Sequence, residues 1–181
     1  LLVGLRDRGL DVTRPILAIL DGAKALTAAV KEVFDHPVIA RCQIHKLRNV
    51  RDHLPEKMRG PVEKRIRAAY HADSALEAEG LLVALAKELE RTHPGAAGSL
   101  REGLHETMTV LRLGVPPTLA RTLRSTNAIE SLNARYRRAV RARGHFPNDQ
   151  AALKCLYLVT RSLDPTGTGR ARWVIRWKAA L

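Results

Sequence analysis

Two short apolar runs near the start of the chain have the pattern of buried strands. Residues 16–20 form an unbroken apolar run bounded by a proline and an Asp-Gly pair, which is typical of a strand buried on both faces. Residues 38–40 form a second run after a His-Pro break, and residues 23–34 between the runs carry apolar side chains at helical spacing. Residues 15–42 therefore predict strand, helix, strand, the crossover unit of a parallel sheet.

After these runs the apolar spacing becomes helical and stays so. A paired proline at 116–117 closes an all-helical block of roughly 60 residues. A short terminal element, residues 173–177, follows a loop at 165–169. The helices expected from the periodicity lie over residues 43–53, 61–71, 74–92, 96–113, from about Asn127 onward, and 149–163. The sequence thus predicts an α/β fold with a large helical part.

The charge is strongly positive and is concentrated in two segments. The chain has 31 basic and 18 acidic residues among 181, a net charge of +13. Residues 41–51 carry four bases and no acid, and residues 121–145 carry seven arginines and one acid. Two such runs with a basic tail favour a nucleic acid as partner. The residues expected to contact DNA are Arg41, Lys46, Arg48, Arg124, Asn133, Arg135, Arg137, Arg138, Arg141 and Arg143.

Composition excludes several classes of protein. A hydrophobic fraction of 45% argues against wholesale disorder, and no apolar run is long enough for a membrane span. The first residues lack the basic start of a secretory signal, and two cysteines are too few for a disulfide scaffold. We therefore expect a cytoplasmic protein. An aromatic content of 4% argues against a base-stacking surface.

Asp21 is the first candidate for chemistry, because it directly follows an apolar strand. Carboxylates at the C-terminal end of a parallel strand face the crevice where α/β proteins bind ligands. The alternative is structural: Asp21 and Gly22 make the turn, and the carboxylate caps the helix that begins near Ala23.

Glu130 is the second candidate, as the one acid of the arginine-rich segment. Asn133, Arg137 and Arg141 lie three, seven and eleven residues after it, so one helix face aligns a carboxylate, an amide and two guanidinium groups. A metal-binding acid beside phosphate clamps has this arrangement. The alternative is a capping box between Asn127 and Glu130.

Cys42 and His45 have the spacing of half a zinc site. A complete site needs two more ligands, and no second pair at a suitable spacing occurs in the sequence. A serine or cysteine nucleophile has no support from spacing, and no glycine-rich phosphate loop is present.

Three stretches, in this order, resemble the mutator-type transposases of bacterial insertion sequences. They are Asp21-Gly22 after an apolar strand, residues 41–50 (RCQIHKLRNV) and residues 125–133 (STNAIESLN). Shorter supporting stretches include residues 53–55 and 99–103. The resemblance covers essentially the whole chain.

The resemblance implies a DDE transposase core of the ribonuclease-H-like fold, interrupted by a helical insertion. It divides the chain into a partial core (1–54), the insertion (55–117) and a return to the core with the basic helix (118–181). Asp21 matches the second catalytic aspartate of the family, Glu130 matches its catalytic glutamate, and both would hold the metal. Cys42 and His45 match a cysteine-x2-histidine signature whose role the resemblance does not settle.

The resemblance also implies cofactors and partners. The family uses magnesium, or manganese, to cleave DNA at transposon ends and to join it to target DNA. The first catalytic aspartate and the first strands are expected before residue 1, because neither Asp7 nor Asp11 matches the motif. We therefore expect the chain to be inactive alone, to expose a strand edge and to self-associate. The location implied is the bacterial cytoplasm, at the nucleoid through DNA.

Two other functions remain open at this point. The chain could be a non-catalytic basic module that binds nucleic acid, or a protein-interaction fragment that uses its helical block. Catalysis requires Asp21 and Glu130 to converge in space, and neither alternative does.

Overall fold

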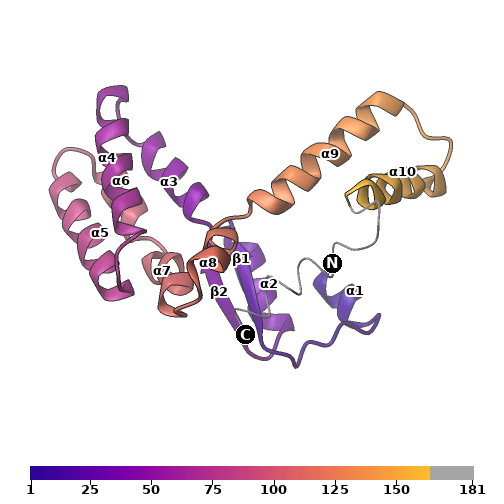
Figure 1. The fold of residues 1–181 in the computed structure, drawn as a ribbon, viewed down its shortest axis with the longest axis horizontal. Helices are drawn as coiled ribbons and strands as arrows, with labels where there is room; N and C mark the ends of the chain where they lie inside the picture. The colour runs from indigo at the N-terminus through magenta and orange to yellow at the C-terminus, as the bar shows by residue number, and fades with distance from the viewer. Residues whose placement is uncertain (164–181) are drawn as a thin grey trace. The chain divides into compact units, whose positions relative to one another are not determined.

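The computed structural model of the chain describes residues 1–163 (Figure 1). Their elements are α1 (Leu2–Arg6), β1 (Ile16–Leu20), α2 (Lys24–Val33), β2 (Pro37–Arg41), α3 (Gln43–Asp52), α4 (Glu56–Ala69), α5 (Ala75–Leu89), α6 (Pro94–Arg101), α7 (Leu104–Arg112), α8 (Pro117–Leu123), α9 (Asn127–Arg143) and α10 (Asp149–Ser162). The loop, terminal element and basic tail expected after residue 164 lie outside the described residues. Within residues 1–163, no helix combines the length and apolarity needed to cross a membrane.

The chain divides into two compact units, Leu1–Thr126 and a second that begins at Asn127. The division falls inside the predicted third segment, 118–181. The first unit holds both strands and the helices from α1 to α8, and the second holds α9 and α10.

The sheet of the first unit has two parallel strands, β1 and β2, joined through α2. The predicted strand–helix–strand unit is therefore confirmed, and the fold is a mostly helical α/β fold. Two strands do not by themselves identify a ribonuclease-H-like sheet.

Side chains of β1 alternate between two apolar clusters, as the period of a strand requires. Ile16, Ala18 and Leu20 belong to a cluster with residues of α2. Leu17 and Ile19 belong to a second cluster with Val110 of α7 and residues of α8. Both faces of β1 are therefore covered, which explains why its sequence is an unbroken apolar run.

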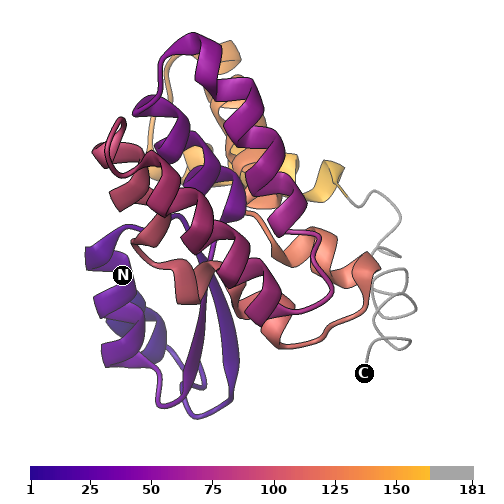
Figure 2. The ribbon, with the colours of Figure 1, turned by 90° about the vertical axis from the view of Figure 1, so that its left-hand side faces the viewer.

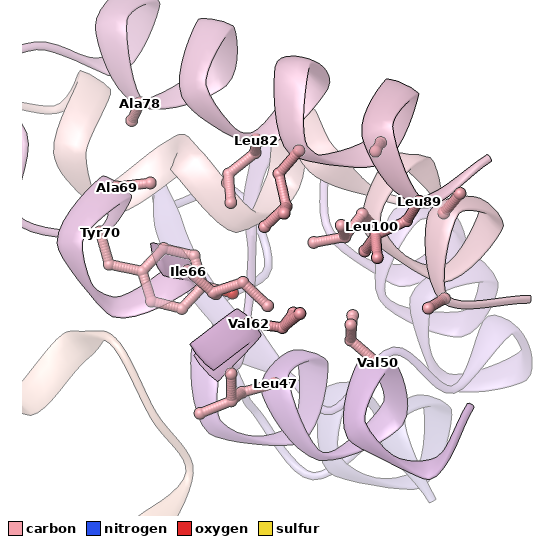
Figure 3. Close-up of a cluster of buried hydrophobic side chains, with 14 of the residues drawn as sticks. Leu47, Val50, Val62, Ile66, Ala69, Tyr70, Ala78, Leu82, Leu89 and Leu100 are labelled. Atoms are coloured by element: carbon pink, nitrogen blue, oxygen red, sulfur yellow. The ribbon is translucent and has the colours of Figure 1, made fainter. Parts of the chain in front are cut away.

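The main core of the first unit lies among helices α3 to α7, above the strands in Figure 2. Figure 3 shows Val50 of α3, Ile66 of α4 and Leu82 of α5 pointing into the same cluster. Helix α3, placed by sequence with the partial core, therefore packs into the helical block. A core of this kind buries apolar surface that strands β1 and β2 are too short to cover.

The helix boundaries differ from the predicted ones at two prolines and a glycine. Helix α4 begins at Glu56 and contains Pro61, where the prediction began. The predicted helix 96–113 is two helices, because Gly103 between them has a positive φ of 60°. Pro117 opens α8 instead of only ending the helical block, since proline is well suited to the first turn of a helix.

The second unit is built from two helices with a linking hydrogen bond. Tyr136 of α9 and Thr160 of α10 share a hydrogen bond of 2.8 Å between their hydroxyl oxygens. The side chain of Asn148 accepts a hydrogen bond from the N–H of Ala151 at 2.9 Å and so caps α10. Both predicted helices of this segment are therefore confirmed.

Helix α5 offers a direct test of the core. Leu85 is 2% exposed and Leu76 is 82% exposed in the same helix. Leu85→Ala should lower the free energy of unfolding by about 3 kcal/mol, because truncation leaves a cavity in a packed cluster. Leu76→Ala should change it by less than about 0.5 kcal/mol. Urea unfolding followed by far-UV circular dichroism measures both values, and equal losses would contradict this core.

Candidate functional site

The register of the two strands brings their last residues to one edge of the sheet. Leu20 at the end of β1 pairs with Arg41 at the end of β2. The N–H of Cys42 donates to the carbonyl oxygen of Leu20 at 2.7 Å. Asp21 and Cys42, which follow these paired residues, are therefore neighbours at the carboxyl edge of the sheet, where α/β proteins bind ligands.

Asp21 closes the turn between β1 and α2 and remains exposed. One of its carboxylate oxygens accepts a hydrogen bond from the N–H of Ala23 at 2.9 Å. Helix α2 begins at Lys24, and the side chain of its N-cap residue, Ala23, makes no capping bond. The structural alternative for Asp21 is therefore confirmed in part: the carboxylate closes the turn and binds the N–H of Ala23, just before the helix. The bond to Ala23 also holds the carboxylate at the strand end.

Cys42, His45 and Thr126 form a compact group at the same edge, which we call the Cys42 cluster. The Cys42 Sγ lies 3.3 Å from the His45 Nδ1. Thr126 donates to this sulfur through its backbone N–H at 3.4 Å and through its hydroxyl at 3.5 Å. The same hydroxyl lies 3.3 Å from the His45 Nδ1. The cluster joins residues 84 positions apart in the chain.

The environment of Cys42 favours its thiolate. Burial of the thiol acts to raise its pKa, but the hydrogen bonds from His45 and Thr126 together outweigh burial and lower the pKa of Cys42. A sulfur that accepts hydrogen bonds is stabilised when it carries negative charge.

The Cys42 cluster is not part of a recognisable zinc site. Among residues 1–163, no group of three or more histidine, cysteine, aspartate or glutamate side chains is placed to hold a metal ion. The zinc interpretation of Cys42 and His45 therefore gains no further ligand from the part of the chain that the structure describes.

An ionic group of two buried cations and one exposed carboxylate lies beside the Cys42 cluster and joins the sheet to the helical block. The Arg41 Nη2 donates to the carboxylate of Glu102 at 3.2 Å, and its Nη1 donates to the Glu102 carbonyl oxygen at 3.4 Å. The Lys46 Nζ donates to the same carbonyl oxygen. The end of β2 and the start of α3 are thereby bound to the link between α6 and α7.

Two glycines leave room for the Arg41 guanidinium. A Cβ on Gly22 or on Gly103 would lie 2.6 Å from a nitrogen of this group, closer than real Cβ contacts allow. Both glycines also have a positive φ, which other residues rarely adopt. Gly22 after β1 is therefore favoured by its packing against Arg41 as well as by the turn.

Arg41 and Lys46, both predicted to contact DNA, are buried in the structure. The side chain of Arg41 is 9% exposed and that of Lys46 is 2% exposed. Both are directed to Glu102, and their contact with DNA stays a prediction. Their role in the structure is to connect the strand end to the helical block.

Arg48 and Arg124 are less buried than Arg41 and Lys46. Arg48 is exposed on α3, so its contact with DNA stays a prediction. Arg124 is half-buried, and its Nη1 lies 3.3 Å from the Nδ1 of His71. The carbonyl oxygen of Arg124 accepts a hydrogen bond from the N–H of Gln43 at 2.9 Å. This bond adds to the Cys42 cluster in tying residues 124–126 to the start of α3.

The second unit carries the remaining predicted residues on α9. Glu130 is half-buried in the first turn of α9. The amide and arginines predicted to contact DNA are all exposed on this helix: Asn133, Arg135, Arg137, Arg138, Arg141 and Arg143. Asp21 belongs to the first unit and Glu130 to the second, so their convergence stays a prediction.

Residues 1–166 match the family described as "Transposase, Mutator family". The chain belongs to this family. The match extends from the strand–helix–strand unit through α9 and α10, and it confirms the resemblance seen in the sequence motifs.

Curated relatives agree with this assignment. The transposase for insertion sequence element ISRM3 of Rhizobium meliloti is 36% identical over 159 residues, which are 86% of this chain and 38% of the relative. A probable transposase for an ISRM3-like element of Sinorhizobium fredii is 36% identical over 148 residues, 80% of this chain and 36% of the relative. A probable insertion-sequence transposase of Corynebacterium diphtheriae is 35% identical over 161 residues, 88% of this chain and 46% of the relative. The chain thus spans less than half the length of these relatives.

Sequence reasoning on this Mutator-family chain missed three residues of the site. Glu102 and Gly103 lie in residues 99–103, a stretch that supports the resemblance to the family, but the sequence indicates no role for them. Thr126 lies in another such stretch, residues 125–133. A lone acid or hydroxyl residue gives no signal of a partner 61 or 84 positions away, so only the folded chain could identify them.

Lys46 should make the stability of this unit rise with pH. Burial lowers the pKa of its ammonium group from 10.5 to about 8, and the Arg41 charge acts in the same direction. Between these two values the unfolded chain binds more protons at this group than the folded chain, so the free energy of unfolding increases as pH rises. The full increase is on the order of 3 kcal/mol.

Urea unfolding at the two ends of this pH window measures the effect, with Lys46→Met as the control. The variant has no ammonium group to release, so its stability should lack this rise. The same pH dependence in both proteins would show that another group is responsible.

Proposed function

We propose that this chain serves in metal-dependent DNA strand cleavage and strand transfer during transposition of an insertion sequence. Asp21 and Glu130 are the acids of this reaction in the proposal. Support comes from membership of the Mutator family and from relatives whose names describe transposases of insertion sequence elements.

One observation carries the catalytic part of the proposal: the chain returns to the sheet edge just before Glu130. Thr126 is bound to Cys42, and Cys42 is bound through its N–H to the residue before Asp21. The helix of Glu130 begins at the next residue, Asn127. A chain segment of about 80 residues between these points therefore leaves the edge of the sheet and comes back to it.

This course fits a ribonuclease-H-like core with a helical insertion. In the proposal, β1 and β2 are two strands of that core and the helices of residues 55–117 are the insertion. The insertion contributes most residues of the main core, which it shares with Leu47, Val50 and Leu54. The ionic group around Glu102 connects it to β2.

The donor types present are those of a magnesium site. Hard divalent cations bind carboxylate oxygens, and Asp21 presents an exposed carboxylate at the strand end. A cation bound there would lower the pKa of an attacking water or hydroxyl and neutralise charge on the phosphate. We propose that Asp21 and Glu130 are two of its ligands and that a third carboxylate comes from outside residues 1–181.

In the proposal, exposed basic and polar residues of this chain bind and orient the DNA. The exposed arginines of α9 suit phosphate oxygens, because a guanidinium group presents two parallel donors. Contacts to phosphates set the position of the duplex and read little sequence. Arg48 of the first unit and Asn133 of α9 are further proposed contacts with DNA. Target joining and self-association of the chain are parts of the same proposal, which places its action on DNA in the bacterial cytoplasm.

Iron-mediated backbone cleavage tests whether the two acids share a cation. Fe²⁺ in place of Mg²⁺, with ascorbate and peroxide, produces hydroxyl radicals that cut the chain near the bound ion. We expect cuts next to both Asp21 and Glu130, which mass spectrometry of the fragments would locate. Asp21→Asn should abolish both sets, because the shared site is lost.

The control for this experiment is Asp11→Asn. Asp11 is also an exposed acid held by a local hydrogen bond, to Thr13, but it lies outside the proposed site. Cuts near one acid only, or at neither, would contradict a shared site and favour the non-catalytic binder. In Mg²⁺ the chain alone should leave supercoiled plasmid uncut, and nicking that survives Asp21→Asn would contradict the catalytic assignment.

The arginines of α9 can be tested through the salt dependence of DNA binding. Each phosphate contact contributes about 0.9 to the slope of log K against log salt concentration. The double variant Arg137→Ala/Arg141→Ala should therefore reduce the slope by about 1.8 and weaken binding to unrelated duplexes alike. Fluorescence anisotropy with labelled duplexes at several salt concentrations measures it.

The matched control removes two exposed arginines that have acidic partners in the first unit. Arg65 pairs with Glu88 at 2.6 Å and Arg67 with Glu63 at 2.6 Å. Arg65→Ala/Arg67→Ala changes the net charge by the same amount and should leave the slope nearly unchanged. Equal effects of the two double variants would mean that overall charge, not α9, binds DNA.

A further inference from the structure

We propose that Cys42 and His45 are positioning residues for Glu130: they anchor Thr126, the residue from which the helix of Glu130 starts. The proposal rests on the function proposed above for Glu130. It assigns a physical role to a cysteine–histidine pair that has no second pair of metal ligands around it in the described chain.

Cys42 is hydrogen-bonded to the residue before Asp21 and to the residue before the helix of Glu130. Its backbone N–H donates to the carbonyl oxygen of Leu20, the residue before Asp21, at 2.7 Å. Its sulfur accepts the N–H of Thr126, the residue before α9, at 3.4 Å. The backbone of Cys42 therefore binds the last residue of β1, before Asp21. Its side chain binds Thr126, before the helix that carries Glu130.

His45 completes the anchor from the first turn of α3. Its Nδ1 lies 3.3 Å from the Cys42 sulfur and 3.3 Å from the Thr126 hydroxyl. His45 comes three positions after Cys42, so the start of α3 places both on the same side. With two residues between them, the cysteine and the histidine of the signature can thus both bind Thr126.

The anchor acts on Glu130 through the covalent chain. Glu130 comes four residues after Thr126 and lies in the first turn of α9. Four residues of helix rise about 6 Å. Fixing Thr126 therefore limits where the first turn of α9, and with it Glu130, can be. The backbone bond from Gln43 to the carbonyl oxygen of Arg124, 2.9 Å, restrains the same segment two residues earlier.

Two features of Cys42 suit it to this role. Cys42 is fully buried, with 0% of its surface exposed, so its donors face no competition from water. It also accepts from both the N–H and the hydroxyl of Thr126, which fixes the orientation of that residue as well as its position.

Amide hydrogen exchange of the first turn of α9 tests the anchor. Thr126→Val keeps the shape of the side chain and removes its hydroxyl, and Cys42→Ala removes the acceptor. Both should speed exchange at residues 130 and 131, the first of α9 whose N–H groups have acceptors within the helix, by roughly 2- to 10-fold, the effect of one lost hydrogen bond. Cys42→Ser keeps an acceptor at this position and should restore part of the protection.

Thr109→Val is the matched control. The Thr109 hydroxyl donates to the carbonyl oxygen of Ile39 in β2 at 2.8 Å, so the variant removes a comparable bond from the same strand. It should leave exchange at residues 130 and 131 unchanged. If the Cys42 cluster contributed only to general stability, Thr126→Val, Cys42→Ala and Thr109→Val would change amide exchange at the start of α9 equally.

The iron-cleavage pattern separates this proposal from the one on which it rests. In the wild-type chain, cuts at both acids test the shared site; in Thr126→Val and Cys42→Ala, cuts near Glu130 should fall while cuts near Asp21 remain. Far-UV circular dichroism verifies that each variant is folded. Unchanged exchange at the start of α9 in both variants would overturn the anchor, whatever the wild-type cleavage pattern shows.

Discussion

The hydrogen bonds of Cys42 hold together the parts of the structure on which the proposed function depends. Its backbone continues the pairing of β1 with β2, and its sulfur binds Thr126 after an excursion of 84 residues. Without this contact the segment that leads to Glu130 would be tied to the strand edge by little more than the Gln43–Arg124 bond. The bond pattern brings Thr126, the residue before α9, to the edge at which the two strands end.

The ionic group of Arg41, Lys46 and Glu102 stabilises the same edge from the other side. It replaces water around two buried cations with one carboxylate and one carbonyl oxygen. Buried cations of this kind are costly when a partner is lost. The helical block is therefore coupled to the strand end by charge as well as by apolar packing, which is consistent with an insertion that supports a site instead of merely interrupting it.

Much of this could be predicted from local pattern. The apolar run at residues 16–20 and the Asp-Gly after it predicted a buried parallel strand ending in a carboxylate, and the structure confirms the strand and the turn. The helix of Glu130 was predicted from its apolar stripe and begins as expected at Asn127. The charge pattern was less informative: it grouped Arg41 and Lys46 with surface arginines, because a basic side chain looks the same in sequence whether it faces solvent or Glu102.

The sequence by itself determined the family, the order of the elements and the residue types at the candidate site, because motifs and periodicity are local properties of a chain. Only the tertiary structure decided which partners those residues have. Glu102 reaches Arg41 across 61 residues and Thr126 reaches Cys42 across 84. Burial and long-range hydrogen bonds arise when distant segments pack, so no local pattern encodes them. Packing thus gives Arg41 and Lys46 an internal partner, Glu102, that the charge pattern alone does not indicate.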